Sequence, residues 1–163
     1  MSDELSDMDE ALLRLAIGVS ARAVANGNMP FGAILADEEG EVLIESENTS
    51  FTGKNILNHA EANLVNMAVT SLSPEQIASA TLYTSCEPCA MCAGAMYWGG
   101  INRMIYAMSE RDLLDYTGGH PDNPTMKGVG SRAVLQSGQR EIDVKGPYLI
   151  AEAGAVQASY WTD

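Results

Sequence analysis

Basic residues are scarce in this chain of 163 residues. Lys and Arg together number 9 against 22 Asp and Glu, which gives a formal net charge of −13. A protein that binds a polyanion through a broad basic face needs positive charge that this sequence lacks. We therefore expect no nucleic-acid partner, and we interpret the acidity as that of a solvated surface.

Cysteines and long apolar segments are scarce as well. The three cysteines are too few, and odd in number, for a disulfide framework, and no apolar run reaches the length of a membrane span. The first seven residues are acidic and lack the apolar core of a secretory signal. These absences predict a protein of a reducing compartment that does not bind membranes, and we expect it to be cytoplasmic.

Hydrophobic residues are plentiful by contrast, at 46% of the chain. A disordered acidic segment does not have this composition, which is sufficient for a packed core. The length suits a single domain, for which about 100–200 residues is usual. We therefore predict one domain over residues 1–163.

Hydrophobic periodicity and turn residues predict helices and strands that alternate along the chain. The expected helices are 7–26, 59–71, 88–98, 109–115 and 148–161, with a short helical piece from Pro74, and the expected strands are 31–36, 41–47, 81–85, 103–108 and 142–144. Residues 116–130 are predicted to form a long loop, which suggests a lid, a binding loop or an oligomer contact. Strands joined through helices predict an α/β fold, a three-layer α/β/α sandwich with a central five-stranded mixed sheet.

Two short motifs carry residues with metal chemistry, and each begins a predicted helix. His59 and Glu61 form an H-x-E motif, and Cys89 and Cys92 belong to a P-C-x-x-C motif. Two thiolates three positions apart share one side of a first helical turn, and a helix N-terminus favours the thiolate form. With His59 they provide three ligands, which is the pattern of a catalytic zinc site with an open fourth position. Glu61 can lie beside the metal without binding it and exchange protons with a bound water.

Two other uses of these cysteines remain as alternatives. Cys86, Cys89 and Cys92 form a CxxCxxC run, but the usual cubane iron–sulfur cluster needs four cysteines. A closed structural zinc site with Cys86 as its fourth ligand would leave Glu61 without a role. We favour the catalytic zinc site and interpret Cys86 as a buried core residue.

Three segments resemble the cytidine-deaminase-like superfamily, whose zinc members carry an H-x-E and P-C-x-x-C signature. They are Pro-Phe-Gly-Ala at 30–33, His-Ala-Glu at 59–61, and the block 83–98 that contains Cys-Glu-Pro-Cys-Ala-Met-Cys. The pattern is most similar to bacterial guanine deaminases and related nucleoside deaminases, over roughly residues 8–116. The resemblance implies that His59, Cys89 and Cys92 hold one zinc ion and that zinc hydroxide attacks an amino-bearing ring carbon. Glu61 would then shuttle the protons, and ammonia would leave.

The resemblance also implies contacts to a flat substrate. Asn48 would hydrogen-bond the base, the Ala60 N–H would meet a ring oxygen, and the Glu87 carbonyl would accept from the departing amino group. Phe31 and Trp98 could flank the ring, although aromatics at such positions are more often plain core. Without the resemblance Asn48 is equally well a turn residue. The Glu87 side chain is expected to be a solvated or capping carboxylate.

Part of the predicted pocket departs from the family pattern. The resemblance implies an acidic residue after the fourth strand. The acidic or His residues that could take this place are Asp112, Asp115 and His120, and the loop 53–58 also differs from the family pattern. Guanine, converted to xanthine in purine metabolism, is nevertheless the best single substrate prediction.

Three alternatives stay open beside guanine: cytosine or another aminated heterocycle, adenosine in tRNA, and a zinc-stabilised module without catalysis. The tRNA alternative needs Lys and Arg for phosphate contacts, which are few here. The family resemblance further implies a homodimer, in which the C-terminal helix at 148–161 packs against or exchanges with the partner.

Overall fold

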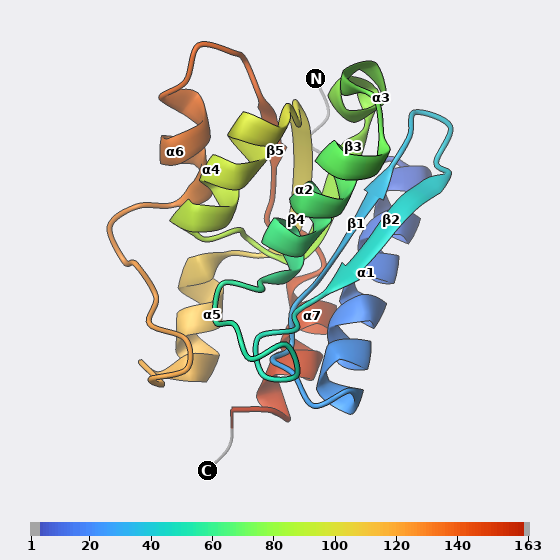
Figure 1. The fold of residues 1–163 in the computed structure, drawn as a ribbon. Helices are drawn as coiled ribbons and strands as arrows, with labels where there is room; N and C mark the ends of the chain where they lie inside the picture. The colour runs from blue at the N-terminus through green and yellow to red at the C-terminus, as the bar shows by residue number, and fades with distance from the viewer. Residues whose placement is uncertain (1–3, 162–163) are drawn as a thin grey trace.

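A five-stranded mixed sheet runs through the middle of the protein, in the strand order β2-β1-β3-β4-β5 (Figure 1). The computed structural model describes residues 4–161. β1 pairs antiparallel with β2 and β3, whereas β3, β4 and β5 run parallel. The strands are β1 (Gly32–Ala36), β2 (Val42–Glu47), β3 (Thr81–Cys86), β4 (Arg103–Met108) and β5 (Asp143–Lys145).

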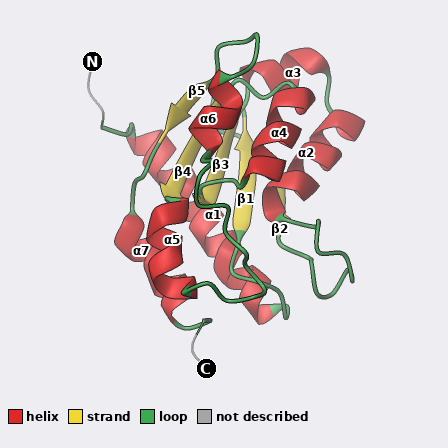
Figure 2. Cartoon of the chain, turned by 90° about the vertical axis from the view of Figure 1, so that its left-hand side faces the viewer, coloured by secondary structure: helices red, strands yellow, loops and turns green. Residues whose placement is uncertain are grey.

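Helices cover both faces of this sheet, which confirms the predicted three-layer α/β/α architecture (Figures 1 and 2). One face carries α1 (Asp7–Ala25), α5 (Glu110–Thr117) and α7 (Ile150–Ala158). The other face carries α2 (Ala60–Ser71), α3 (Pro74–Ser79), α4 (Ala90–Gly99) and α6 (Ser131–Gln136). Within residues 4–161, none of these helices is long and apolar enough to cross a lipid bilayer.

The two helical layers explain the uninterrupted apolar character of β1. Successive side chains of a strand point to opposite faces of the sheet. Ala33 and Leu35 pack in the core beneath α2 and α4, while Ile34 and Ala36 pack in the core beneath α1. Because both faces are buried, the strand needs apolar residues at every position rather than at alternate ones.

The structure differs from the predicted elements mainly in the last third of the chain. α6 was not expected, because its six residues contain only two adjacent large apolar side chains, Val134 and Leu135, and such a short segment has little periodicity. It follows the irregular segment 118–130, which is shorter than the predicted loop 116–130 because α5 continues to Thr117. α7 packs against α1, α5 and β4 of the same chain.

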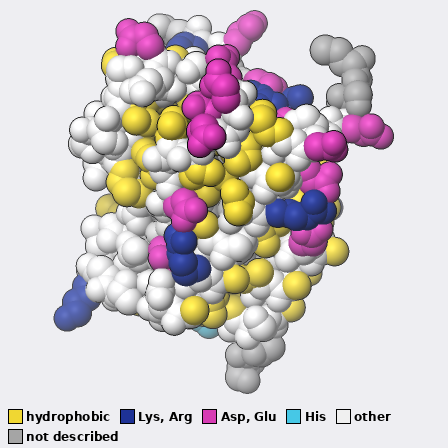
Figure 3. All heavy atoms as spheres, turned by 90° about the vertical axis from the view of Figure 1, so that its right-hand side faces the viewer, with side chains coloured by type: hydrophobic (Ala, Val, Ile, Leu, Met, Phe, Trp, Pro, Cys, Tyr) yellow, Lys and Arg dark blue, Asp and Glu magenta, His cyan; other side chains and the backbone are white. Residues whose placement is uncertain are grey.

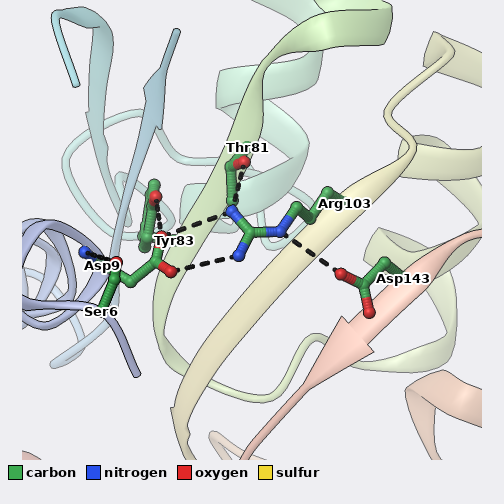
Figure 4. A network of polar contacts seen from close by, with 6 residues as sticks. All are labelled: Ser6, Asp9, Thr81, Tyr83, Arg103 and Asp143. Carbon is green, nitrogen blue, oxygen red and sulfur yellow. Dashed lines mark hydrogen bonds and ion pairs between the residues drawn. The ribbon is translucent and has the colours of Figure 1, made fainter. Parts of the chain in front are cut away.

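A partly buried polar network joins α1 to the three parallel strands of the sheet (Figure 4). Arg103 donates to both carboxylate oxygens of Asp9, at 3.3 and 3.1 Å, and the Tyr83 hydroxyl donates to Asp9 at 2.7 Å. The Asp9 carboxylate is therefore charged and fully partnered, although Asp9 is only 6% exposed. The six side chains drawn are Ser6, Asp9, Thr81, Tyr83, Arg103 and Asp143.

Candidate active site

Three potential metal ligands meet where α2 and α4 begin. His59 is the N-cap residue of α2, Cys89 is the N-cap residue of α4, and Cys92 lies in the first turn of α4. The Nδ1 atom of His59 lies 3.6 Å from the Sγ atoms of both Cys89 and Cys92. The three donor atoms all lie within 4.8 Å of one another, although the residues are 30 and 33 positions apart in the chain.

The spacing of these donor atoms fits a tetrahedral zinc ion. Zinc binds sulfur at about 2.3 Å and imidazole nitrogen at about 2.0–2.1 Å, and tetrahedral geometry then separates the two donors by about 3.6 Å. The His59–Cys89 and His59–Cys92 distances have this value. Cys86 does not belong to this cluster, so the described residues supply three ligands and leave a fourth position for water or substrate.

The local electrostatics favour a metal cation at this place. Neither His59 nor Cys89 makes a side-chain capping hydrogen bond, so their donor atoms are free for other use. The pKa of Cys89 is lowered to about 4, mainly because the Cys92 thiol donates a hydrogen bond to its sulfur. The pKa of His59 is raised, chiefly by its hydrogen bond with Cys89. A metal bound at this place would displace thiol protons, because cysteine binds a metal as the thiolate.

Glu61 is held beside the three ligands on the first turn of α2. It is 5% exposed, and its carboxylate lies 2.6 Å from the Thr84 hydroxyl. The same hydroxyl lies 2.8 Å from the carbonyl of Cys86, and its single hydrogen serves only one acceptor at a time. Burial raises the pKa of Glu61. The side chain can therefore exist as a carboxylate that accepts from Thr84 or as an acid that donates to it.

A small cavity of about 40 Å³ lies in front of the ligands and Glu61. A wider cavity of about 210 Å³ adjoins it, because His59, Cys89, Glu110 and Asn123 line both. The wider cavity is also lined by Ile56 and Leu57, which precede α2, and by residues 122–126 of the segment 118–130. The inner cavity is lined by Met29, Phe31, His59, Glu61, Cys86, Glu87, Cys89, Glu110, Leu113 and Asn123.

Only some of the residues expected to contact substrate line this cavity, and Ala60 and Asn48 are not among its lining residues. Phe31 and Glu87 line it, and Ala60 is the buried first residue of α2, between His59 and Glu61. Asn48 is fully buried, and its N–H donates to the Phe31 carbonyl at 3.0 Å. Its side-chain oxygen accepts from Ser50, but its Nδ2 group has no hydrogen-bond partner among residues 4–161.

Four other candidates do not reach the cavity within this chain. Trp98 is 87% exposed in the last turn of α4. Asp112 accepts from Ser109 in a capping box at the start of α5, and Asp115 is exposed. The His120 ring packs against Trp161, with 5.2 Å between the ring centroids.

Glu110 and Asn123 line the pocket instead, and neither is among the residues predicted from the sequence. Glu110 is the first residue of α5 and follows the C-terminal end of the parallel strand β4, which is where ligands bind in α/β sheets. Its position just after β4 is therefore the feature of the sequence that could have identified Glu110 as a pocket residue. Burial and the neighbouring Glu87 raise the pKa of Glu110 to about 8. Asn123 has no comparable signal, because it lies inside the irregular segment 118–130.

Comparisons with known proteins agree with this arrangement. The family described as the cytidine and deoxycytidylate deaminase zinc-binding region matches residues 6–108. A probable cytosine deaminase from Schizosaccharomyces pombe is 38% identical over 160 residues, which cover 98% of this chain and 96% of that protein. The guanine deaminase of Bacillus subtilis is 35% identical over 107 residues, or 65% of this chain and 68% of that protein.

The same fold occurs in a solved structure of a guanine deaminase. The structure, from Nitrosomonas europaea, superimposes with a TM-score of 0.76 over 98% of this chain and 97% of that one, at 21% identity. The family match and the relatives define the class of hydrolytic nucleobase and nucleoside deaminases, and the ligand geometry is consistent with the zinc-binding region of that family. The chain belongs to the cytidine and deoxycytidylate deaminase family, which confirms the resemblance and the enzyme class inferred from the sequence.

Proposed function

We propose that the chain deaminates a small free nucleobase with one zinc ion held by His59, Cys89 and Cys92. The observation that carries this proposal is the position of Glu61, buried next to three ligands whose spacing fits zinc and facing a cavity. A zinc ion bound there supplies a water molecule whose pKa is lowered toward about 7 and which therefore becomes a nucleophile.

The protein's own groups then move protons and hold the base. Glu61 takes a proton from the water and returns it to the substrate, and its raised pKa suits a group that must both accept and release one. Thr84 can donate to its carboxylate form and accept from its acid form. The unpartnered Nδ2 of Asn48 is a buried donor that costs about 1–3 kcal/mol when unsatisfied, so it is suited to a carbonyl oxygen of the base.

Cytosine is the first substrate candidate. The relative named a probable cytosine deaminase aligns with 98% of this chain, and the aligned region therefore includes the part of the chain that holds the pocket-lining residues Glu110, Leu113 and Asn123.

Guanine, which the sequence resemblance favours, is the second candidate because of the 35% identical guanine deaminase. Adenosine in tRNA is disfavoured by charge, since Arg14, Arg22 and Arg103 are paired with carboxylates. Figure 3 shows no continuous basic area on the face that it draws, within the described part of the chain.

Ammonia release across a panel of free bases, their nucleosides and nucleotides tests this proposal. We expect the highest kcat/KM with free cytosine and a lower one with guanine. A clear preference for a nucleotide or for a tRNA anticodon stem would contradict the proposal. Zinc content, measured on the same samples by atomic absorption, should be one ion per chain.

We also propose that the enzyme is a homodimer that uses the outer face of α4. No charged residue occurs between Pro88 and Asn102, and within this stretch Met91 and Trp98 are 38% and 87% exposed. Two copies of a chain with a charge of −13 can approach through an uncharged apolar face with little repulsion. Light scattering should give twice the monomer mass, and Trp98→Glu should give the monomer. A monomeric wild-type protein would contradict the proposal.

A further inference from the structure

The Glu87 side chain is hydrogen-bonded to the starts of α5 and α6, the two helices that flank the outer wall of the pocket. Glu87 lies in the turn between β3 and α4, two residues before Cys89. Its backbone N–H donates to the Met108 carbonyl at 2.7 Å, which ties this turn to the end of β4. The side chain leaves the turn on the side of α5 and α6, so the metal-binding motif and the pocket wall meet at this residue.

The Glu87 carboxylate accepts three hydrogen bonds from two helix starts. One oxygen accepts from the N–H of Glu110, at 3.0 Å. The other accepts from the N–H and the hydroxyl of Ser131, at 3.1 and 2.8 Å. Glu110 and Ser131 are the first residues of α5 and α6, where backbone N–H groups have no partner inside the helix. One carboxylate thus caps two helices, and charged hydrogen bonds of this kind are strong.

The segment between these two helices covers the cavity but makes few bonds to the rest of the protein. Asn123 lines the inner cavity, and Pro124, Thr125 and Met126 line the wider one. Among residues 4–161, the hydrogen bonds formed by residues 119–129 join positions no more than three apart. The beginning of the segment is fixed by the packing of His120 against Trp161, and its end is fixed by Glu87.

Gly130 allows the close approach at that end. A Cβ atom at this position would lie 3.2 Å from Oε1 of Glu87, closer than most contacts of this kind. Glycine therefore lets the backbone of the segment come up against the carboxylate.

We propose that Glu87 is a positioning residue for the deamination: its carboxylate fixes Glu110 and the end of segment 118–130 against the metal-binding motif, so that the substrate cavity is closed on its outer side. The inference rests on the proposed function for its effect on catalysis. It does not depend on the identity of the base, because the contacts involve the wall of the pocket rather than the ligand.

Glu87→Ala and Ser131→Ala test this role with a readout of the wall itself. Lys127 is exposed within the segment and is a trypsin site. In Glu87→Ala we expect cleavage after Lys127 to become about tenfold faster, and KM to rise about tenfold with a smaller change in kcat. Ser131→Ala should show the same changes to a lesser degree, because it leaves the backbone N–H bonds in place. Zinc content should stay at the wild-type value in both.

Two further variants separate positioning from general loss of stability. Ser73→Ala serves as the control, because it also removes a side chain that caps a helix, here α3, outside the pocket. It should leave KM and the cleavage at Lys127 unchanged. Glu87→Gln keeps the shape of the side chain and should recover part of the wild-type KM.

Unchanged KM and unchanged cleavage in both Glu87→Ala and Ser131→Ala would overturn the proposal. If the wild-type protein deaminated no base at all, the proposed function would fail. The trypsin measurement would still decide whether Glu87 anchors the segment.

Discussion

Two buried carboxylates lie on opposite faces of the same strand, and they differ in what surrounds them. Tyr83 and Thr84 are neighbours in β3, and Tyr83 binds Asp9 on one face while Thr84 binds Glu61 on the other. Asp9 also accepts hydrogen bonds from two nitrogens of the Arg103 guanidinium, whereas no Lys or Arg in the described part of the chain forms an ion pair with Glu61. The Asp9 carboxylate, whose oxygens accept hydrogen bonds from Arg103 and Tyr83, stabilises the fold. The Glu61 carboxylate has fewer hydrogen-bond donors around it and is available to a ligand or a proton.

The acidities of the two groups follow from this difference. Burial raises the pKa of Asp9, but hydrogen bonds from Arg103, Tyr83 and Ser6 outweigh it and bring the pKa below its ordinary value. Burial also raises the pKa of Glu61, and there the opposing contacts are too few to reverse the effect. Asp9 is therefore held in its charged form, whereas Glu61 is able to change its protonation state.

Removing the Glu61 carboxylate should have the largest effect. We expect Glu61→Gln to lower kcat by about 10³-fold, because general acid–base catalysis contributes about 10²–10⁴-fold. The variant should keep its zinc and its free energy of unfolding. Turnover, metal analysis and urea denaturation measure the three quantities. Unchanged turnover would contradict proton transfer by Glu61 and would favour the alternative of a zinc-stabilised module without catalysis.

Asp9→Ala should produce the opposite pattern, with stability lost and catalysis kept. It leaves the Arg103 charge without its main partner, and breaking a buried ion pair typically costs about 3–5 kcal/mol. Because the Arg103 side chain is 31% exposed, we expect about 2 kcal/mol. Urea denaturation gives this number, and kcat per folded molecule should match the wild type. A large loss of kcat at full stability would show that the two clusters are coupled.

Asn48→Ala should weaken substrate binding more than it weakens the fold. We expect KM to rise about tenfold, since one hydrogen bond to the base is lost. The free energy of unfolding should fall by less than that of Asp9→Ala, because the Nδ2 group has no partner to lose within residues 4–161. Steady-state kinetics with the best base of the panel and urea denaturation test this. An unaltered KM would remove Asn48 from the substrate contacts.

The pH dependence of stability should reveal the smallest effect. A carboxylate whose pKa is lowered by folding stabilises the protein above its ordinary pKa of about 3.9, and this stabilisation disappears as the pH falls through the folded value. The difference in unfolding free energy between wild type and Asp9→Asn should therefore be full at neutral pH and shrink below about pH 4. A difference that stays constant down to pH 2 would contradict the lowered pKa of Asp9.

The sequence was most informative where chemistry and local structure coincide. His59 and Cys89 could be placed at helix starts because each precedes an apolar periodic segment, and the sheet followed from the alternation of elements. The family match agrees with this part of the interpretation. These features depend on residues close together in the chain, for which spacing alone is sufficient evidence.

The outer wall of the pocket could not be predicted in the same way. Asp112 was a reasonable candidate by type and position, but its carboxylate is used by the Ser109 cap, two residues away from Glu110, which does line the cavity. The contact between Glu87 and Ser131 joins residues 44 positions apart. No short-range pattern encodes such contacts, because they arise only when the tertiary structure brings the segments together.

The cap positions of α2 and α4 show a trade-off between folding and chemistry. Helix starts are normally occupied by Ser, Thr, Asp or Asn, and their loss typically costs about 1 kcal/mol. Here the two positions hold His59 and Cys89, neither of which caps its helix. A sequence selected for stability alone would place different residues at both. At both positions the helix lacks the stabilisation that a capping side chain would provide, and both positions hold proposed metal ligands.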